Sequence, residues 1–432
     1  MKEKYNVCLL NDSFPPAIDG VANSVFNYAT IINKKGADVV VTTPKYPDVD
    51  DNYPFEVVRY PSLDTTSLVG YRTGYPFSIP AVRKIAEHNV DIIHCHCPIV
   101  SLLMARYLRK IFKAPVIFTY HTKFDIEVRK AIEMNMLQSA AIKAIVKNIE
   151  AADEVWVVSE GAGENLRSMG YSGEYVVMDN GVDFPLGRVS DEEIEKISKL
   201  HNLSNDVPVF LFVGRVTWYK GTKITLDALK MIKDKGERFK MIFVGDDNER
   251  PQIEEYANSL GLKDNCIFVG AVRDRQLLRA YFCRSDLFLF PSTYDTNGIV
   301  VREAAACALP SVLIEGSCAA EGVEDGVSGL LIDENPESMV KTLLYACHNL
   351  DELKKIGVGA QENIYISWEK AVNRAYERYK VVYERCLGKN YDASELREDE
   401  MFNLAAEWYK VSTKIKNKTT EFKDAIKKNF DI

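Results

Sequence analysis

The sequence lacks several features that define large classes of protein. Its 432 residues contain no run of eighteen apolar residues, so no transmembrane helix is expected. Basic residues are not in excess, because 54 lysines and arginines face 62 aspartates and glutamates, and this argues against a dedicated nucleic-acid-binding protein. No signal peptide separates Met1 from the first strand-like segment at Asn6. We therefore expect a cytoplasmic protein.

Cysteine patterns typical of disulfide or metal proteins are also missing. The nine cysteines are odd in number and scattered, which indicates reduced core residues in a cytoplasmic chain. The segment His94-Cys95-His96-Cys97 suggests a metal site at first sight. Alternate residues of a strand point to opposite faces, however, and no second Cys/His pair with zinc-type spacing follows. We expect no metal site and interpret the segment as a strand end near a cleft.

The chain does contain an alternation of short apolar segments with amphipathic ones, and this alternation occurs twice. In the first half we expect strands at 7–10, 38–42, 56–60, 90–94, 116–120, 154–159 and 175–178, and helices at 24–34, 80–87, 101–112, 131–151 and 161–169. In the second half we expect strands at 209–213, 239–244, 266–269, 287–290 and 311–314, and helices at 191–201, 221–233, 251–260, 274–283 and 300–307. This order predicts two doubly wound α/β domains, whose ligands bind beyond the carboxyl ends of the strands.

The turn-rich segment Asn180–Pro185 separates the two halves. We place the domains at residues 1–185 and 186–369, and expect helices of about 370–432 to cross back onto the first domain. The last part, Lys410–Phe430, interleaves lysines with apolar residues. It is either a packing helix or a helix on a membrane surface.

Two cations follow the first strand of the second half. Arg215 and Lys220 lie five residues apart between Gly214 and Gly221, where a strand passes into a helix. Glycines let the backbone approach a ligand, and a helix N-terminus favours negative charge. Arg215 can grip a phosphate with its fork, and Lys220 supplies a point charge. The segment is either a diphosphate site or a surface turn with two solvated cations.

Two carboxylates follow a later strand. Asp295 lies in the loop after strand 287–290, and Glu303 lies about one turn into the helix that begins near Ile299. Carboxylates so placed can bind two sets of sugar hydroxyls, and the amides of Ile299 and Val300 would face a phosphate. The alternative is a capping acid followed by an exposed helical glutamate.

Two segments at strand ends in the first half are also candidates. The loop from Asn11 to Ala22 lacks the three spaced glycines of the dinucleotide fingerprint, which counts against an NAD enzyme. Gly20 could still let backbone amides reach a phosphate or a sugar, although an ordinary loop fits as well. His121 follows strand 116–120, where it is either a structural hydrogen-bonding residue or a catalytic one.

In this order, the four segments resemble the group-1 (family 4) retaining glycosyltransferases, which have the GT-B fold. The resemblance covers about residues 5–385. It is strongest in the Gly-Arg-x4-Lys-Gly run ending at Gly221, the turn Val244-Gly245-Asp246 and the acid-x7-acid element from Asp295 to Glu303. It implies two tandem Rossmann-like domains with a cleft between them and a helical C-terminal tail. The loop that holds Gly20 is similar to that of the branch acting on diacylglycerol.

The resemblance implies a role for each candidate residue. Arg215 and Lys220 would hold the donor diphosphate and stabilise the leaving group, while Asp295 would contact the transferred sugar. Glu303 would bind the ribose, and His121 would stabilise the reacting centre. The other donor-binding positions are Gly20 near the phosphates, Val272 near the base, and Gly298, Ile299 and Val300 at the start of a helix. No metal or cofactor would be needed, since the cations and helix termini meet the charge of the diphosphate.

Two departures from the family pattern lie where the sugar would sit. Asp295 replaces the usual glutamate, and Asn297 replaces a frequent aromatic residue. We expect retaining transfer of a hexose, with UDP-glucose as the first choice of donor, to the hydroxyl of a lipid such as diacylglycerol, a glycan or a small molecule. A GDP-mannose-dependent transferase and a nucleotide-sugar-binding protein without catalysis are the alternatives. The basic residues of segment 101–150 fit either a peripheral contact with the inner face of the membrane or a solvated surface.

Overall fold

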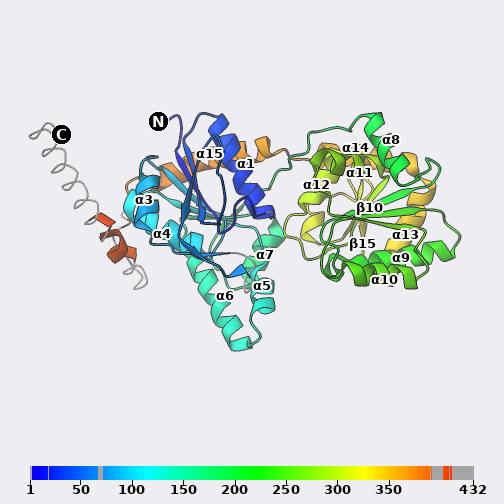
Figure 1. Ribbon diagram of the computed structural model, residues 1–432, viewed down its shortest axis with the longest axis horizontal. Coiled ribbons are helices and arrows are strands. Elements are labelled where there is room, and N and C mark those ends of the chain that lie inside the picture. The colour runs from blue at the N-terminus through cyan, green and yellow to red at the C-terminus, as the bar shows by residue number, and fades with distance from the viewer. Residues whose placement is uncertain are drawn as a thin grey trace, which may run out of the picture. The chain divides into compact units, whose positions relative to one another are not determined.

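Two parallel β-sheets, each in its own unit, organise the chain (Figure 1). The computed structural model describes residues 2–17, 19–66, 72–389, 391, 402–407, 409 and 410. The first unit contains the described residues up to Val157, residues 163–178 and the described residues from Val372 onward. The second contains residues 158–162 and 179–371.

The sheet of the first unit has seven parallel strands in the order β3-β2-β1-β6-β7-β8-β9. These strands are β1 (Val7–Leu10), β2 (Val39–Pro44), β3 (Glu56–Tyr60), β6 (Ile92–Cys95), β7 (Val116–Tyr120), β8 (Glu154–Val157) and β9 (Tyr175–Val177). The helices are α1 (Gly20–Lys34), α3 (Ile79–Ala86), α4 (Val100–Phe112), α5 (Phe124–Ala131), α6 (Asn135–Glu150) and α7 (Glu160–Ser168). Two short strands, β4 (Ser62–Leu63) and β5 (Thr73–Gly74), form a separate antiparallel pair.

The sheet of the second unit has six parallel strands in the order β12-β11-β10-β13-β14-β15. They are β10 (Val209–Val213), β11 (Lys240–Val244), β12 (Cys266–Gly270), β13 (Leu287–Phe290), β14 (Ser311–Ile314) and β15 (Leu330–Ile332). The helices are α8 (Asp191–Leu200), α9 (Thr222–Asp234), α10 (Arg250–Ser259), α11 (Arg275–Arg284), α12 (Ile299–Ala306), α13 (Pro336–His348) and α14 (Leu350–Asn363), with 3-10 turns η1 (Trp218–Lys220) and η2 (Cys318–Ala320). Apart from the half-buried Lys240, the residues of β10, β11, β13 and β14 are buried, as expected of parallel strands covered on both faces.

The predicted fold class is confirmed, one helix prediction is wrong, and three short strands were not predicted. The helix expected over 131–151 begins at Asn135, and a separate helix, α5, precedes it. The chain breaks between them because Ile132 is extended at φ −124°. Strand β15 was not expected, since it has only three residues and lies between Gly329 and Asp333. The short β4–β5 pair was missed for the same reason of length.

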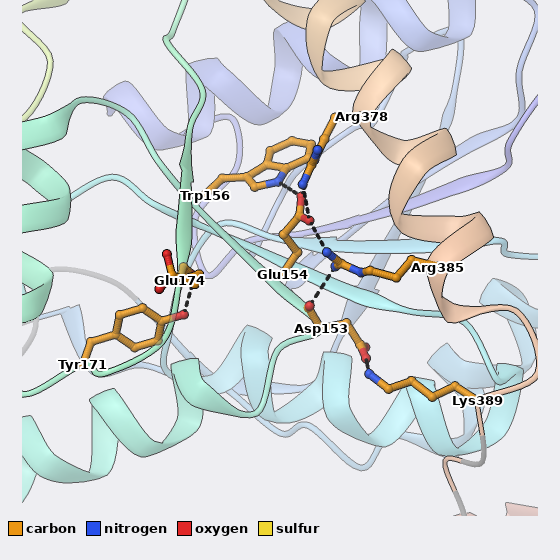
Figure 2. Close-up of polar contacts among 8 residues, drawn as sticks. All are labelled: Asp153, Glu154, Trp156, Tyr171, Glu174, Arg378, Arg385 and Lys389. Carbon is orange, nitrogen blue, oxygen red and sulfur yellow. Dashed lines mark hydrogen bonds and ion pairs between the residues drawn. The ribbon is translucent and has the colours of Figure 1, made fainter.

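Helix α15 (Trp368–Cys386), from far along the chain, packs on the first unit. Glu154 of β8 accepts hydrogen bonds from Arg378 at 2.8 Å and from the Trp156 indole at 2.7 Å, and it pairs with Arg385 at 2.9 Å (Figure 2). Although burial alone would raise the pKa of Glu154, the hydrogen bonds from Arg378 and Trp156 and the charge of Arg385 hold it below its usual value. Lys389 pairs with Asp153 at 2.7 Å.

The end of the described chain also contacts the first unit. The ring of Phe402 lies 4.5 Å from the guanidinium carbon of Arg106 on α4, and the backbone oxygen of Ala405 accepts a hydrogen bond from Tyr107 at 3.3 Å. The segment after Lys410, expected to be a packing or membrane-surface helix, lies outside the described residues. In the part of the chain that the structure describes, no helix is long and apolar enough to cross a membrane.

Candidate active site

Three glycines form the backbone edge at the carboxyl ends of three neighbouring strands in the second unit. Gly214 follows β10, Gly245 follows β11, and Gly270 ends β12. The amide of Gly245 donates to the Gly270 oxygen at 2.9 Å, and the amide of Gly214 donates to the Val244 oxygen at 3.0 Å. A Cβ atom at Gly245 would lie 1.8 Å from the Gly214 oxygen, so no side chain fits there. Glycine at position 245 therefore lets the ends of β10 and β11 pack closely together.

Lys220 and Asp295 meet at this edge. Lys220 ends η1 after β10, and Asp295 lies in the loop after β13, the strand that pairs with β10. The Lys220 Nζ is 2.5 Å from Asp295 Oδ1, and Asp295 Oδ2 accepts a hydrogen bond from the Ser292 hydroxyl at 2.6 Å. The segments of Lys220 and Asp295, which the sequence analysis treated as separate candidate sites, are thus in direct contact.

Arg215 lies on the same side of the unit but is held differently. Its guanidinium is exposed and lies 5.5 Å from the centre of the Tyr219 ring, which packs against Tyr294 at 4.5 Å. Among the described residues Arg215 forms no ion pair. Its charge is therefore available to an anionic ligand, whereas that of Lys220 is already balanced by a carboxylate.

Glu303 is buried, so the alternative of an exposed helical glutamate is wrong. One turn into α12, its Oε1 accepts a hydrogen bond from Arg275 at 2.5 Å, and Arg275 also pairs with both carboxylate oxygens of Asp183. Burial raises the pKa of Glu303, and the Arg275 guanidinium opposes this shift. The sequence analysis gave no role to Arg275 or Asp183. No motif or regular spacing links these two residues with Glu303, and their charge alone does not indicate a contact.

The start of α12 presents the predicted backbone positions. Gly298 caps the helix at φ +57°, and Ile299 and Val300 are its first two residues, whose amides have no acceptor within the helix. Asn297, in place of the family's frequent aromatic residue, is buried and donates to the Val158 backbone oxygen of the same unit. Val272 lies between β12 and α11 and is partly buried against the core of the unit.

His121 follows β7 in the first unit and is buried beside another histidine. Its Nε2 lies 2.9 Å from Nδ1 of His96, which follows the neighbouring strand β6. The ring nitrogens of His94 lie 2.7 Å from the Tyr379 hydroxyl and 2.7 Å from the Thr119 hydroxyl. Burial lowers the pKa of His121 to about 3 and those of His94 and His96 well below their usual value, so all three rings are neutral at pH 7.

The cysteines of the segment His94–Cys97 do not face its histidines. The Cys95 thiol donates to the Cys97 backbone oxygen at 3.1 Å, on the face of β6 opposite to the histidines. Among the described residues, no group of three or more His, Cys, Asp or Glu side chains could hold a metal ion.

The N-terminus of α1 holds a carboxylate of its own. The helix expected from Ser24 begins at Gly20, and Asp19 accepts hydrogen bonds from the amides of the next two residues, Val21 and Ala22, at 2.8 and 2.7 Å. A phosphate at this helix end would therefore meet Asp19. Asp12, to which the sequence assigned no role, is buried and accepts hydrogen bonds from the start of α4, from the Val100 amide at 3.2 Å and from both the amide and hydroxyl of Ser101.

Comparison with protein families accounts for most of the chain. A model described as Glycosyl transferases group 1 matches residues 193–363, and one described as Glycosyltransferase Family 4 matches residues 18–184. The chain belongs to the group 1, family 4 glycosyltransferases. Each match falls on one of the two α/β sheets, and the glycine edge with Lys220, Asp295 and Glu303 lies within the first of them.

Similar proteins include two named alpha-monoglucosyldiacylglycerol synthase. The one from Streptococcus pneumoniae is 23% identical over 308 residues, 70% of each chain, and the one from Acholeplasma laidlawii is 23% identical over 366 residues, 82% of this chain and 91% of that protein. Among solved structures, sucrose-phosphate synthase from Thermosynechococcus elongatus has a TM-score of 0.73 at 21% identity, covering 88% of this glycosyltransferase and all of that chain. Anabaena HepE in complex with UDP and glucose has a TM-score of 0.68 at 20% identity, covering 87% and 99%. These likenesses confirm the GT-B fold.

Proposed function

We propose that this glycosyltransferase moves glucose from UDP-glucose to the hydroxyl of a lipid acceptor such as diacylglycerol, with retention at the sugar. The contact between Lys220 and Asp295, beside the available charge of Arg215, is the observation that carries the proposal. It combines diphosphate-binding cations with a carboxylate able to bind sugar hydroxyls beyond the carboxyl ends of two paired strands. The names of the two synthases and the UDP and glucose bound to HepE support the choice of donor and acceptor.

In this proposal the diphosphate of the donor binds Arg215, Lys220 and the amides of Ile299 and Val300. The two cations stabilise the negative charge that develops on the β-phosphate oxygen as the glycosidic bond breaks. The acceptor hydroxyl attacks from the face that UDP leaves, and its proton passes to the departing phosphate oxygen. This assigns retention to substrate geometry, without a covalent intermediate on the protein.

The remaining roles follow from hydrogen-bonding chemistry. Asp295 accepts from hydroxyls of the transferred glucose, and Glu303, oriented by Arg275, accepts from the ribose hydroxyls. The backbone around Val272 meets the base, Gly298 allows the turn into α12, and Gly20 supplies backbone near the phosphates. His121, a neutral imidazole, stabilises the reacting centre.

The proposed reaction needs no metal ion, because two cations and a helix N-terminus balance the diphosphate. We therefore expect the transfer rate to be unchanged by EDTA and by added Mg²⁺. A loss of more than about tenfold in EDTA, restored by Mg²⁺, would contradict this part of the proposal.

The α5–α6 hairpin supports a lipid acceptor at an anionic membrane surface. Met134, Met136 and Leu137 are 59%, 74% and 48% exposed at the junction of the two helices, which extend away from the sheet of their unit (Figure 1). Exposed basic residues of the hairpin, Arg129, Lys143 and Lys147, lie on the same two helices. The hairpin also exposes Glu127 and Glu133, so it is the apolar triplet at its tip that carries this part of the proposal.

A donor screen tests the first half of the proposal. Nucleotide release is measured with UDP-glucose, UDP-galactose, GDP-mannose and ADP-glucose, with and without diacylglycerol vesicles. We expect release from UDP-glucose that depends on the lipid. Release from GDP-mannose instead would favour the alternative donor, in line with a 25% identical relative named GDP-mannose-dependent alpha-mannosyltransferase. Tight nucleotide binding without release from any donor would favour a binding protein without catalysis.

Variants then test the donor site. Arg215→Ala and Lys220→Ala should each weaken UDP binding, measured by isothermal titration, by roughly tenfold or more. The matched control is Arg238→Ala, which removes an exposed arginine from the same unit and should leave UDP binding unchanged. Equal affinities in all three variants would show that the donor site is elsewhere.

Vesicle flotation tests the lipid surface. The triple variant Met134→Ser/Met136→Ser/Leu137→Ser should float less with anionic vesicles than the wild type does. The double variant Leu186→Ser/Leu200→Ser removes two leucines, 57% and 64% exposed, from the second unit and should float as the wild type does. Equal flotation of all three proteins would show that a surface other than the hairpin binds the membrane. Flotation of none would favour a glycan or small-molecule acceptor.

A further inference from the structure

Two buried histidines from neighbouring strand ends share one hydrogen bond. The Nδ1 of His96 lies 2.9 Å from the Nε2 of His121, and the side chains belong to residues that are 2% and 8% exposed. Each histidine follows a strand, β6 or β7, and these strands are paired in parallel. The contact is therefore fixed by the sheet and does not depend on a mobile loop.

The shared hydrogen bond limits where the protons can be. A neutral imidazole carries one N–H donor and one acceptor nitrogen, and a hydrogen bond between two such rings needs one of each. Either His96 Nδ1–H donates to His121 Nε2, or His121 Nε2–H donates to His96 Nδ1. The two arrangements place the proton of His121 on different atoms.

The other nitrogen of His96 distinguishes between them. His96 Nε2 is buried without a hydrogen-bond partner, and the ring packs against Tyr28 at 5.4 Å and His94 at 4.1 Å. A proton on this atom would be a buried N–H group without an acceptor, which is the rarer and costlier kind of unsatisfied group. The proton of His96 is therefore on Nδ1, where it has an acceptor.

We propose that His96 is a positioning residue that donates to Nε2 of His121 and so fixes the proton of His121 on Nδ1. His121 is then a neutral ring that carries its proton on Nδ1 and accepts at Nε2. The tautomer is inferred from the contacts of His96. Its use in sugar transfer rests on the function proposed above for His121.

Nitrogen NMR tests the tautomer directly. The protein has six histidines, few enough for 15N-histidine labelling to resolve each ring, with His121→Gln identifying the signals of residue 121. In the wild type at pH 7 we expect a protonated Nδ1 and an unprotonated Nε2 for His121. In His96→Leu the donor is gone, and we expect the proton to move to Nε2. A protonated Nε2 in the wild type, or an unchanged Nδ1 proton in His96→Leu, would overturn the proposal.

The conservative variant His96→Asn separates positioning from packing. Its amide nitrogen replaces His96 Nδ1 as a donor, so His121 should keep its Nδ1 proton. We expect kcat for transfer from UDP-glucose to fall roughly tenfold to hundredfold in His96→Leu, as for other residues that orient a functional side chain. The KM for UDP-glucose should change less than about twofold, and His96→Asn should recover most of kcat.

Equal losses of kcat in both His96 variants, or a loss confined to KM, would contradict the catalytic part of the proposal. His201→Phe is the matched control, because it removes a partly buried histidine that bonds to the Tyr281 hydroxyl at 2.8 Å in the other unit. It should leave the signals of His121 unchanged. If the wild type transfers no sugar at all, the proposed function fails, while the NMR result still decides whether His96 sets the tautomer.

Discussion

The ammonium group of Lys220 lies 2.5 Å from the carboxylate of Asp295, and the two residues follow the paired strands β10 and β13. The donor diphosphate therefore does not meet an isolated cation at this position. It must share Lys220 with a carboxylate that also repels it. The same carboxylate is placed to bind the sugar. Asp295 should therefore weaken the binding of UDP alone and strengthen the binding of UDP-glucose in the transition state.

Replacing Asp295 separates these two effects. In Asp295→Asn the repulsion of the diphosphate is removed, and UDP should bind roughly fivefold to tenfold more tightly, equivalent to about 1 kcal/mol. Transfer from UDP-glucose should fall by roughly tenfold to hundredfold, because the charged acceptor for the sugar hydroxyls is lost. Calorimetry with UDP and steady-state kinetics measure the two quantities.

Asp227→Asn is the matched control for this variant. It breaks the exposed pair between Lys223 and Asp227 on α9, 2.7 Å apart, and should change neither quantity. Weaker binding of UDP to Asp295→Asn would contradict the assignment of Lys220 to the diphosphate.

Glu303→Gln should weaken UDP binding by roughly tenfold or more, since a charged acceptor for the ribose hydroxyls becomes a neutral one. Calorimetry checks this, and Glu255→Gln on the exposed face of α10 is the control. An unchanged affinity for UDP would remove Glu303 from the donor site.

Arg275→Met should act on stability as well as on binding. It leaves the buried carboxylate of Glu303 without its cation, although the arginine is itself 46% exposed and its pairs are partly screened. We expect the second unit to lose about 1–3 kcal/mol of stability, measured by urea unfolding. The double variant Arg275→Met/Glu303→Gln should recover part of this loss, and no recovery would contradict the pairing.

Much of this site was accessible from the sequence because parallel sheets bring successive strand ends to one edge. Lys220 and Asp295 were each placed after a strand, so their presence on that edge was predictable. Their direct contact was not, because it depends on β10 and β13 being neighbours although two strands separate them along the chain. The contact between Arg275 and Glu303 could not be predicted for another reason. The sequence does not show which of the surface arginines lies beside the buried glutamate.

The histidine pair shows how far the same reasoning extends. The sequence placed His96 and His121 after consecutive strands, and pairing of those strands would have brought the two rings together. The helix α5 was missed because residues 124–131 alternate charged and apolar side chains without a continuous apolar stripe. Its existence depends on packing against α6, which a local pattern does not record.

Gly245→Ala should be strongly destabilising for a reason beyond backbone strain. Both Gly245 and Gly236 have positive φ, +141° and +89°, so alanine is strained at either position. Only at Gly245 would the new Cβ meet backbone, 1.8 Å from the Gly214 oxygen, whereas nothing lies within 4 Å at Gly236. We expect a loss of about 1 kcal/mol for Gly236→Ala and at least about 3 kcal/mol for Gly245→Ala, with UDP binding lost only in the latter. Similar losses in both would contradict a close-packed edge.

The first unit should become less stable as the pH falls below about 6.5. Its buried histidines stay neutral when folded, with the pKa of His121 at about 3, whereas unfolded histidines bind protons near pH 6.5. The unfolded chain therefore takes up more protons, and the free energy of unfolding falls by about 1.4 kcal/mol per pH unit for each of these histidines. Urea unfolding at several pH values between about 5.5 and 7.5 measures how the free energy of unfolding changes with pH.

His121→Asn is the control for this slope. It should make the pH dependence shallower by one proton. Asp12 and His88, whose raised pKa values act in the opposite direction, are the same in both proteins. Identical slopes in the two proteins would show that folding leaves the pKa of His121 unchanged.

The attachment of α15 to β8 has a consequence for synthesis. Glu154 and Asp153 acquire their partners Arg378, Arg385 and Lys389 only after more than half of the chain that follows them has been made. The ribosome thus finishes the second unit before it releases the helix that completes the first. A chain truncated after residue 371 would contain the whole second unit and a first unit without most of α15, so proteases should cleave its first unit first.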